Sequence, residues 1–372
     1  MKLKHADSKE TEGKLPPNGP AAMGEIADLK LSETTLRLMH RENLSRAEAA
    51  NFLECLLKPA ITDAQIAAAL TSLAVKGETV DELAGMAEAM RNRALPVRSR
   101  HKVFIDTAGT GSSSAKAFNV STAAAFVIAG AGLPVAKHGS RAATSLCGSA
   151  DVIEALGINT ACEPETVERC LNEHGICFMF APVFHRATAR VAHIRRELRV
   201  HTTFNLLGPL TNPARAPFQI LGVWHRSLLE RVASALSVLG VEKGWVVHGS
   251  DGLDEITITD KTFVAACSSN GTIETFTISP EDFGLKQQSL NGLGARGPQA
   301  SAEMIRAILQ GQNSGTFAVA RDLIIINAAA ALHIAGVATD LHHAASLGRE
   351  SIDSGRAASK LEALIRGTNR DR

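Results

Sequence analysis

Hydrophobic positions follow a helical spacing in the first part of the chain. Residues 1–23 are polar and contain a proline-rich cluster, so we expect a disordered leader there. From residue 24 to 97, apolar side chains recur every three or four positions, and no β-prone run interrupts them. Three of these apolar runs are preceded by residues that commonly cap helices, Ser45, Thr62 and Thr79. The pattern predicts an all-helical domain of about four helices that ends at Pro96.

A different pattern begins at residue 98, where short β-prone runs alternate with helical segments. These runs lie at 103–105, 133–136, 219–223, 244–248, 256–258 and 273–278. The alternation is typical of a mostly parallel sheet covered by helices. We therefore expect the α/β fold class, with a small all-helical N-terminal domain and a larger α/β domain at 98–372 around a mostly parallel central sheet. Helices near 165–200 are expected to supplement the helical domain.

Composition narrows the classes of function. The chain has 372 residues, enough for two domains, and 39 basic against 38 acidic side chains give a net charge of +1. Nucleic-acid binding normally shows a basic excess, so nucleic acid is not an expected partner. The six cysteines form no C-x-x-C pair and the N-terminus lacks a signal-peptide core, which favours a cytoplasmic protein. Polar residues or proline interrupt the apolar runs at 123–136 and 323–338, so we expect buried core elements and no membrane span.

Residues 106–157 contain the clearest candidate chemistry. A glycine- and serine-rich turn, Gly109 to Ser114, follows a β-prone run and precedes a helix that starts near Asn119. Glycine lets backbone amides approach a phosphate, and a helix N-terminus favours negative charge, so the turn is a candidate anion site. The alternatives are that the glycines serve only packing and that the serines belong to a surface loop.

A second loop is expected beside this turn. The next β-prone run leads to Lys137 and Arg141 at the same sheet edge, because neighbouring βα units usually lie side by side. Two cations and two sets of loop amides could then converge on one polyanion. An acidic pair, Asp254 and Glu255, follows another β-prone run, and carboxylate oxygens suit Mg²⁺. Taken alone, such a pair is more often a solvated loop, and the arginines at 186–196 are by default a solvated helix face.

Several segments, in their order and spacing, resemble the anthranilate phosphoribosyltransferase family, and the likeness extends from Leu29 to Gly367. Two of them, FNLLGPLTNPA at 204–214 and DGLDE at 251–255, are highly specific together. The others are KGETVDEL (76–83), GTG…NVST (109–122), AKHG (136–139), GSADVIEALG (148–157) and NAAAALHIAG (327–336). The resemblance implies a helical domain on an α/β domain, usually in a homodimer. It also implies Mg²⁺-dependent transfer of the phosphoribosyl group from phosphoribosyl pyrophosphate (PRPP) to the amine of anthranilate, in tryptophan biosynthesis.

The resemblance also implies which residues form the site. PRPP is expected at Gly109, Thr110, Gly111, Ser112, Ser113, Asn119, Ser121, Thr122, Lys137 and Ser149. Anthranilate is expected at Gly109, His138, Ser140, His185, Arg195, Gly208 and Pro209, with Arg195 at its carboxylate and a Gly208-Pro209 turn against its ring. Mg²⁺ is expected at Ser121, Asp254 and Glu255. For His185, packing within the fold is the alternative. The aryl amine is neutral at pH 7, so we expect positioning and electrostatics, not a strong base, to carry the reaction.

The chain departs from the family's pattern around one ligand. Where the family has GTGGDG, this chain has GTGSSS, so a positive φ at residue 112 or 114 would be strained. Other family residues are replaced by Ser140 (for Asn), Leu146 and Cys147 (for Lys-Ser), Arg199 (for Gly) and His201 (for Arg). Serine hydroxyls can still donate to phosphate, so the biosynthetic enzyme remains the main interpretation. The alternatives are a transferase or phosphorylase with another acceptor, and a non-catalytic protein that binds nucleic acid through the arginines at 186–199.

Overall fold

The N-terminal domain is a bundle of four helices. The computed structural model describes residues 20–111, 118–142, 147–294 and 297–370. The four helices are α1 (Pro20–Met39), α2 (Arg46–Leu56), α3 (Asp63–Lys76) and α4 (Val80–Arg93). Reciprocal capping boxes at Ser45, Thr62 and Thr79 begin α2, α3 and α4, as the sequence predicts. α1 begins at Pro20, inside the expected leader, because proline and the alanines after it suit a first helical turn.

One seven-stranded sheet forms the centre of the α/β domain, in the order β3-β2-β1-β4-β5-β6-β7. Strands β1 to β5 run parallel and β6 and β7 are antiparallel additions, which confirms the prediction of a mostly parallel sheet. The strands are β1 (Ile105–Gly109), β2 (Val135–Gly139), β3 (Ile176–Phe180), β4 (Phe218–Gly222), β5 (Lys243–Gly249), β6 (Thr262–Ser268) and β7 (Ile273–Ile278). Parallel strands place their carboxyl ends at one edge, where open α/β sheets bind ligands.

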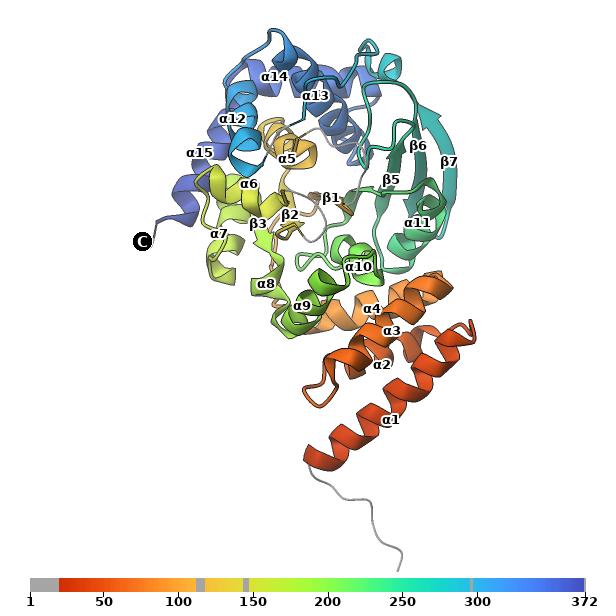
Figure 1. Cartoon of the computed structure of the whole chain (residues 1–372). Coiled ribbons are helices and arrows are strands. Elements are labelled where there is room, and N and C mark those ends of the chain that lie inside the picture. The colour runs from red at the N-terminus through yellow and green to blue at the C-terminus, as the bar shows by residue number, and fades with distance from the viewer. Residues whose placement is uncertain (1–19, 112–117, 143–146, 295–296, 371–372) are drawn as a thin grey trace, which may run out of the picture.

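Helices cover both faces of the sheet (Figure 1). On one face α5 and α13 pack together, and α14 and α15 pack around them to close the larger core. On the other face α11 packs on β5, β6 and α4, so the sheet shares this second core with the helical domain. The helices are α5 (Val120–Gly130), α6 (Ser149–Ala155), α7 (Pro164–His174), α8 (Ala181–Phe184), α9 (Ala189–Leu198), α10 (Thr203–Leu210), α11 (Leu229–Val238), α12 (Pro298–Leu309), α13 (Thr316–Ile334), α14 (Leu341–Asp353) and α15 (Arg356–Thr368), with 3₁₀ helices η1 (Arg186–Thr188), η2 (Arg226–Leu228) and η3 (Pro280–Phe283).

The helices near residues 165–200 divide between the two domains. α7 packs on β3 and α15, and its buried Val167 and Cys170 belong to the core of the α/β domain. α9 packs on α3, and its buried Val191 and Ile194 join the core of the helical domain. The second half of this segment therefore packs with the helical domain, whereas the first half packs within the α/β domain.

Two local predictions were wrong. Residues 256–258 form no strand, because the amide of Ile256 donates to the Asn327 side chain of α13 and the amide of Thr257 donates to the Thr262 hydroxyl. Gly208-Pro209 is not a free turn but the last part of α10. Proline lacks a backbone N–H, and its ring clashes with the preceding turn of a helix. Both effects are tolerated here because Pro209 lies in the last turn of α10.

α13 is the most apolar long helix of the described chain. By length and composition it alone, among the described helices, could cross a membrane. However, 72% of its apolar window is buried inside the protein, where it packs against α5 and α14. The helix is a core element, as Asn327 and His333 within the apolar run predict.

Arg199, which stands where the family has glycine, ends α9 in the left-handed region at φ 53° and ψ 26°. A residue with a β-carbon pays about 1–2 kcal/mol in this conformation. Glycine removes that strain but loses about 0.5–1 kcal/mol more entropy on folding. We expect Arg199→Gly to raise the free energy of unfolding by about 0.5–1 kcal/mol, measured by urea denaturation.

The matched control is Arg196→Gly, at an exposed position within the same helix. This change is expected to lower the free energy of unfolding by about 1 kcal/mol, because glycine is a poor helix former. A similar loss in both variants would show that the left-handed residue carries no strain.

Candidate active site

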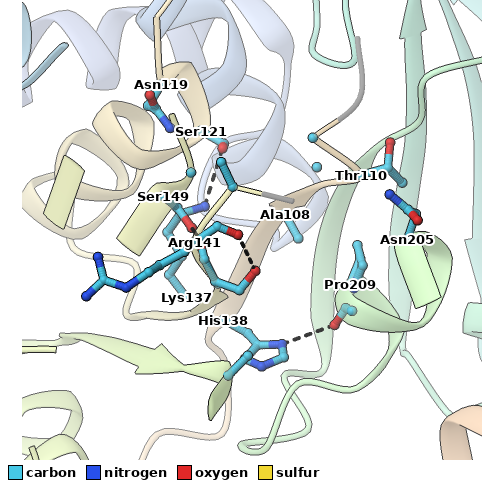
Figure 2. Close-up of a pocket in the computed structure, with 18 of the residues that line it drawn as sticks. Ala108, Thr110, Asn119, Ser121, Lys137, His138, Arg141, Ser149, Asn205 and Pro209 are labelled. Carbon is cyan, nitrogen blue, oxygen red and sulfur yellow. Dashed lines mark hydrogen bonds between the residues drawn. The ribbon is translucent and has the colours of Figure 1, made fainter. Parts of the chain in front are cut away.

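A cavity of about 380 Å³ lies at the carboxyl ends of β1 and β2, bordered by α9, α10 and the loop that carries Asp254 and Glu255. Figure 2 shows Asn119, Ser121 and Ser149 on one side of it, and Asn205 and Pro209 across from them. The predicted site residues that line it are Gly109, Thr110, Gly111, Asn119, Ser121, Lys137, His138, Ser140, Ser149, His185, Arg195, Gly208, Pro209, Asp254 and Glu255. Thr122 does not line it, because its side chain is fully buried in α5. Ser112 and Ser113 lie outside the described residues.

Glycines at the ends of β1 and β4 allow the loop that carries Asp254 and Glu255 to lie against these strand ends. A β-carbon on Gly222 would lie 1.7 Å from the backbone oxygen of Asp254, so only glycine at the end of β4 permits this approach. The amide of Gly111 donates to Asp254 Oδ2 at 2.9 Å, and the amide of Ser121 donates to Glu255 Oε1 at 3.2 Å. The acidic pair therefore contacts both the glycine turn and the first turn of α5.

The electrostatics of the acidic pair fit a divalent cation. Burial, and then repulsion from Asp254, raise the pKa of Glu255 to about 8, although Lys137 and Ser121 act in the opposite direction. A cation held by Asp254 and Glu255 would offset this repulsion. The described residues contain no group of three or more His, Cys, Asp or Glu side chains that could hold a metal ion, but Mg²⁺ commonly uses one or two carboxylates with water and substrate phosphates. The oxygen donors present suit that ion.

Lys137 lies at the base of the cavity. Its ammonium donates to the Thr107 carbonyl and, at 3.3 Å, to the Ser121 hydroxyl. Burial lowers the pKa of Lys137, and the nearby Asp106 and Glu255 oppose that shift. The lysine is thus a buried counter-charge between β1 and α5, directly behind the acidic pair.

Arg141 does not act as the second free cation that its position suggested. The side chain lines the cavity, but its guanidinium donates to Asp151 at 2.9 Å and to Glu154 at 2.7 Å, both in α6. Two carboxylates on the adjacent helix therefore hold the charge away from the polyanion site. Sequence spacing could not show this competition.

Two histidines form an uncharged wall. The rings of His138 and His185 lie 5.1 Å apart. His138 Nδ1 lies 3.1 Å from the Gly208 carbonyl and His185 Nε2 lies 3.1 Å from the Thr211 carbonyl, so both nitrogens carry hydrogen. Burial, with repulsion from His185, lowers the pKa of His138 to about 3, and burial lowers that of His185 to about 4. Both rings are neutral at pH 7, and His185 combines packing with a place in the cavity wall.

Arg195 provides the cation of the opposite wall. Burial lowers the pKa of Arg195 to about 10, so the guanidinium stays protonated at neutral pH. It donates to Asn205 Oδ1 at 3.3 Å and lies 5.7 Å from the Phe204 ring. No ion pair to Arg195 occurs among the residues that the structure describes, so its charge faces the cavity uncompensated by a carboxylate.

Some lining residues were missed by the sequence analysis. Asn205 and Phe204 come from α10, and Ser301 comes from the first turn of α12. Ser301 lies 182 residues from Asn119 in the sequence, and its hydroxyl donates to Asn119 Oδ1 at 3.2 Å. Cys147 Sγ donates to the same oxygen at 3.4 Å. Asn205 lies within the resembling segment 204–214 and could have been found there. Ser301 has no local signal.

The chain resembles known families and proteins over most of its length. Residues 101–358 match a family model described as "Glycosyl transferase family, a/b domain", and residues 32–94 match "Glycosyl transferase family, helical bundle domain". The anthranilate phosphoribosyltransferase of Moorella thermoacetica is 51% identical over 87% of this chain and 94% of its own length. That of Myxococcus xanthus is 45% identical over 91% and 99%.

Solved structures of two relatives share the fold. The anthranilate phosphoribosyltransferase of Thermus thermophilus has a TM-score of 0.83 and 38% identity, covering 90% of this chain and 98% of its own. The Saccharomyces cerevisiae structure "in complex with PRPP and Mg" has a TM-score of 0.83 and 28% identity, covering 92% and 99%. The likeness therefore includes both domains.

The two neutral histidines, His138 and His185, make the stability of the fold depend on pH. A histidine whose pKa is lower in the folded state binds its proton more readily when unfolded, so stability falls as pH drops below about 6.5. We expect the wild type to lose about 2 kcal/mol more unfolding free energy than His138→Asn between pH 7 and pH 5, measured by urea denaturation. Asparagine keeps a donor for the Gly208 carbonyl but does not titrate.

The control is His40→Asn, at an exposed position beyond the end of α1. Its stability is expected to follow that of the wild type over this pH range. Parallel pH curves for wild type and His138→Asn would contradict a buried neutral His138.

Proposed function

The chain belongs to the anthranilate phosphoribosyltransferase family, and from that premise we propose how its cavity transfers the phosphoribosyl group of PRPP to the amine of anthranilate. One observation carries this function. The glycine turn, the acidic pair and Arg195, which are far apart in the sequence, line one cavity. The cavity therefore offers a place for a polyanion, for its cation and for a small aromatic acid.

The donor half of the cavity holds pyrophosphate by amides and charge. We assign this role to the turn at Gly109–Gly111, to Asn119, Ser121, Lys137 and Ser149, and to the backbone at the start of α5, which includes Thr122. Ser112 and Ser113 remain assigned by resemblance. Asp254 and Glu255, with Ser121, would hold Mg²⁺, which neutralises the charge that develops on departing pyrophosphate. The yeast relative with PRPP and Mg supports this choice of ion.

The acceptor half of the cavity suits anthranilate. Arg195 faces the cavity and would pair with the carboxylate, whereas His138, His185 and the Gly208-Pro209 end of α10 would enclose the ring. Ser140 and Gly109 lie nearer the donor half and would border the amine. During the reaction the C1–O bond to pyrophosphate breaks, the N–C1 bond forms, and the amine nitrogen loses one proton to water or to the released pyrophosphate. Because the amine is neutral beforehand, holding it against C1 is the main task of these residues.

The family resemblance favours a homodimer, and the helical domain offers a face for it. Leu29, Leu36 and Met39 on α1 and Val75 on α3 are left 57–71% exposed. Large apolar groups exposed together mark interaction surfaces, so we place the second copy there.

We also propose a cytoplasmic location, where the six free cysteines would stay reduced.

A nucleic-acid function receives little support from the arginines of α9. Arg190 donates to Asp63 at 2.5 Å and is therefore already ion-paired. At the end of α9, Arg196 and Arg199 remain exposed, with Glu197 between them in the sequence. Catalysis is the better account of the charge pattern in the cavity.

The function is tested by loss of anthranilate fluorescence with PRPP and Mg²⁺. We expect turnover in the wild type that stops when a chelator is added. Asp254→Asn with Glu255→Gln is expected to lower kcat/KM by at least about a hundredfold, because the cation loses both carboxylates. The double variant should fold normally, since two amides do not repel each other.

The control for the acidic pair is Glu281→Gln on the exposed surface of η3, which should leave turnover unchanged. Full activity in the double variant would overturn the metal assignment. Absence of turnover in the wild type, with PRPP still bound, would point to a different acceptor.

Arg195→Ala separates the two substrates. Removing a charged hydrogen bond of about 1.5–3 kcal/mol should raise the KM for anthranilate about tenfold to a hundredfold. The KM for PRPP should change by less than about twofold. Arg196→Ala, an exposed neighbour on the same helix, is the control. Equal increases in both KM values would mean that Arg195 only supports the fold.

A further inference from the structure

Four consecutive backbone carbonyls at the end of α10 each accept a hydrogen bond from the side chain of a different element. Gly208 O accepts from His138 of β2 at 3.1 Å, and Pro209 O accepts from Gln219 of β4 at 2.7 Å. Leu210 O accepts from Arg91 of α4 at 2.8 Å, and Thr211 O accepts from His185, directly after α8, at 3.1 Å. The four donors are therefore His138, Gln219, Arg91 and His185.

Three of these carbonyls need such partners because of where they lie, whereas Gly208 O also accepts from the amide and the hydroxyl of Thr211, at 3.3 and 3.1 Å. The last carbonyls of a helix have no intrahelical donor, and burial without a partner would cost each of them a hydrogen bond. Leu210, Thr211 and Pro209 are buried or nearly so. The four side chains thus determine where the end of α10 sits, and with it the Gly208-Pro209 wall of the acceptor half.

Arg91 connects this helix end to a second one. Its Nη1 donates to the Leu239 carbonyl at 3.0 Å, at the C-terminal cap of α11. One guanidinium in α4 therefore joins the ends of α10 and α11, whose dipoles both favour a cation. Burial, with repulsion from Arg215, lowers the pKa of Arg91 to about 10, so it stays charged at neutral pH.

Gln219 of β4, within the sheet, supports the Gly208-Pro209 wall through its hydrogen bond to the Pro209 carbonyl. It is 2% exposed and stands opposite Asp106 of β1 in the strand register. Asp106 Oδ1 in turn accepts the backbone N–H of His138 at 3.2 Å. The side chains beneath the wall therefore form one layer that positions both Pro209 and His138.

We propose that Arg91 and Gln219 are positioning residues for the acceptor half of the site. Neither lines the cavity, and each acts by holding a backbone carbonyl whose neighbours form the cavity wall. Loss of either bond lets the wall move away from Arg195 and His138, and displacements of about 1 Å are enough to lower binding and reactivity. The donor half does not share these supports. This inference rests on the proposed function, because anthranilate is the acceptor used to test it.

The experiment compares Gln219→Leu and Arg91→Met with the wild type. In each variant we expect the KM for anthranilate to rise at least tenfold and the KM for PRPP to change by less than twofold. Arg91→Lys keeps the charge but cannot reach both carbonyls, so its KM for anthranilate should lie between those of wild type and Arg91→Met. Arg93→Met, at an exposed position of the same helix where Arg93 pairs with Glu54, is the matched control.

Assays are run well below the midpoint of thermal unfolding of each variant, so that only folded protein is compared. Where Arg91→Met does not fold, Arg91→Lys and Gln219→Leu decide the outcome. Unchanged KM for anthranilate in these variants, or equal increases for both substrates, would overturn the proposal. Failure of the proposed function is distinguishable, because the wild type would then show no turnover of anthranilate.

Discussion

The close approach of the acidic loop to the ends of β1 and β4 is the constraint on which the site depends. Asp254 and Glu255 lie together at the sheet edge, where burial and mutual repulsion raise the pKa of Glu255. The arrangement is stabilised by amides from the glycine turn and from α5, and by the buried charge of Lys137. Glycine at position 222 makes it sterically possible. One short loop thereby gathers the groups that attract a divalent cation and those that attract phosphate.

The donor and acceptor halves of the cavity bind their ligands through different interactions. In the donor half, charges and backbone amides face each other across the ends of the strands. In the acceptor half, two neutral histidines and a helix end enclose a space in which Arg195 is the cation without an ion-pair partner among the described residues. A single charge beside apolar and neutral groups acts in a lower dielectric and therefore selects an anionic acceptor more strongly. Neutral histidines are thus part of that selectivity, because a protonated wall would attract PRPP to the wrong half.

The fold was predictable wherever a local signal exists. Ser45, Thr62 and Thr79 begin helices through contacts within four residues, and alternating β-prone runs indicate the parallel sheet. The strand predicted at 256–258 does not form because the amide of Ile256 donates to the side chain of Asn327, which is distant in sequence, and not to a neighbouring strand. Most of the site residues that motif spacing predicted also line the cavity. Ser301 and Arg91 could not be found in this way, since packing alone brings them to the site.

The departures from the family's pattern retain hydrogen-bond donors better than they retain charge. Cys147, in place of serine, donates to Asn119 Oδ1 as Ser301 also does, and Ser140 retains a hydroxyl at the cavity. The charge of Arg141 is engaged by α6, and the lysine of the family's pattern is absent at position 146. Among the residues that the structure describes, Lys137 then remains as the buried cation of the donor half. With fewer protein cations available, a larger share of the neutralisation of pyrophosphate falls to Mg²⁺ at the acidic pair, which makes the approach permitted by Gly222 more important in this chain.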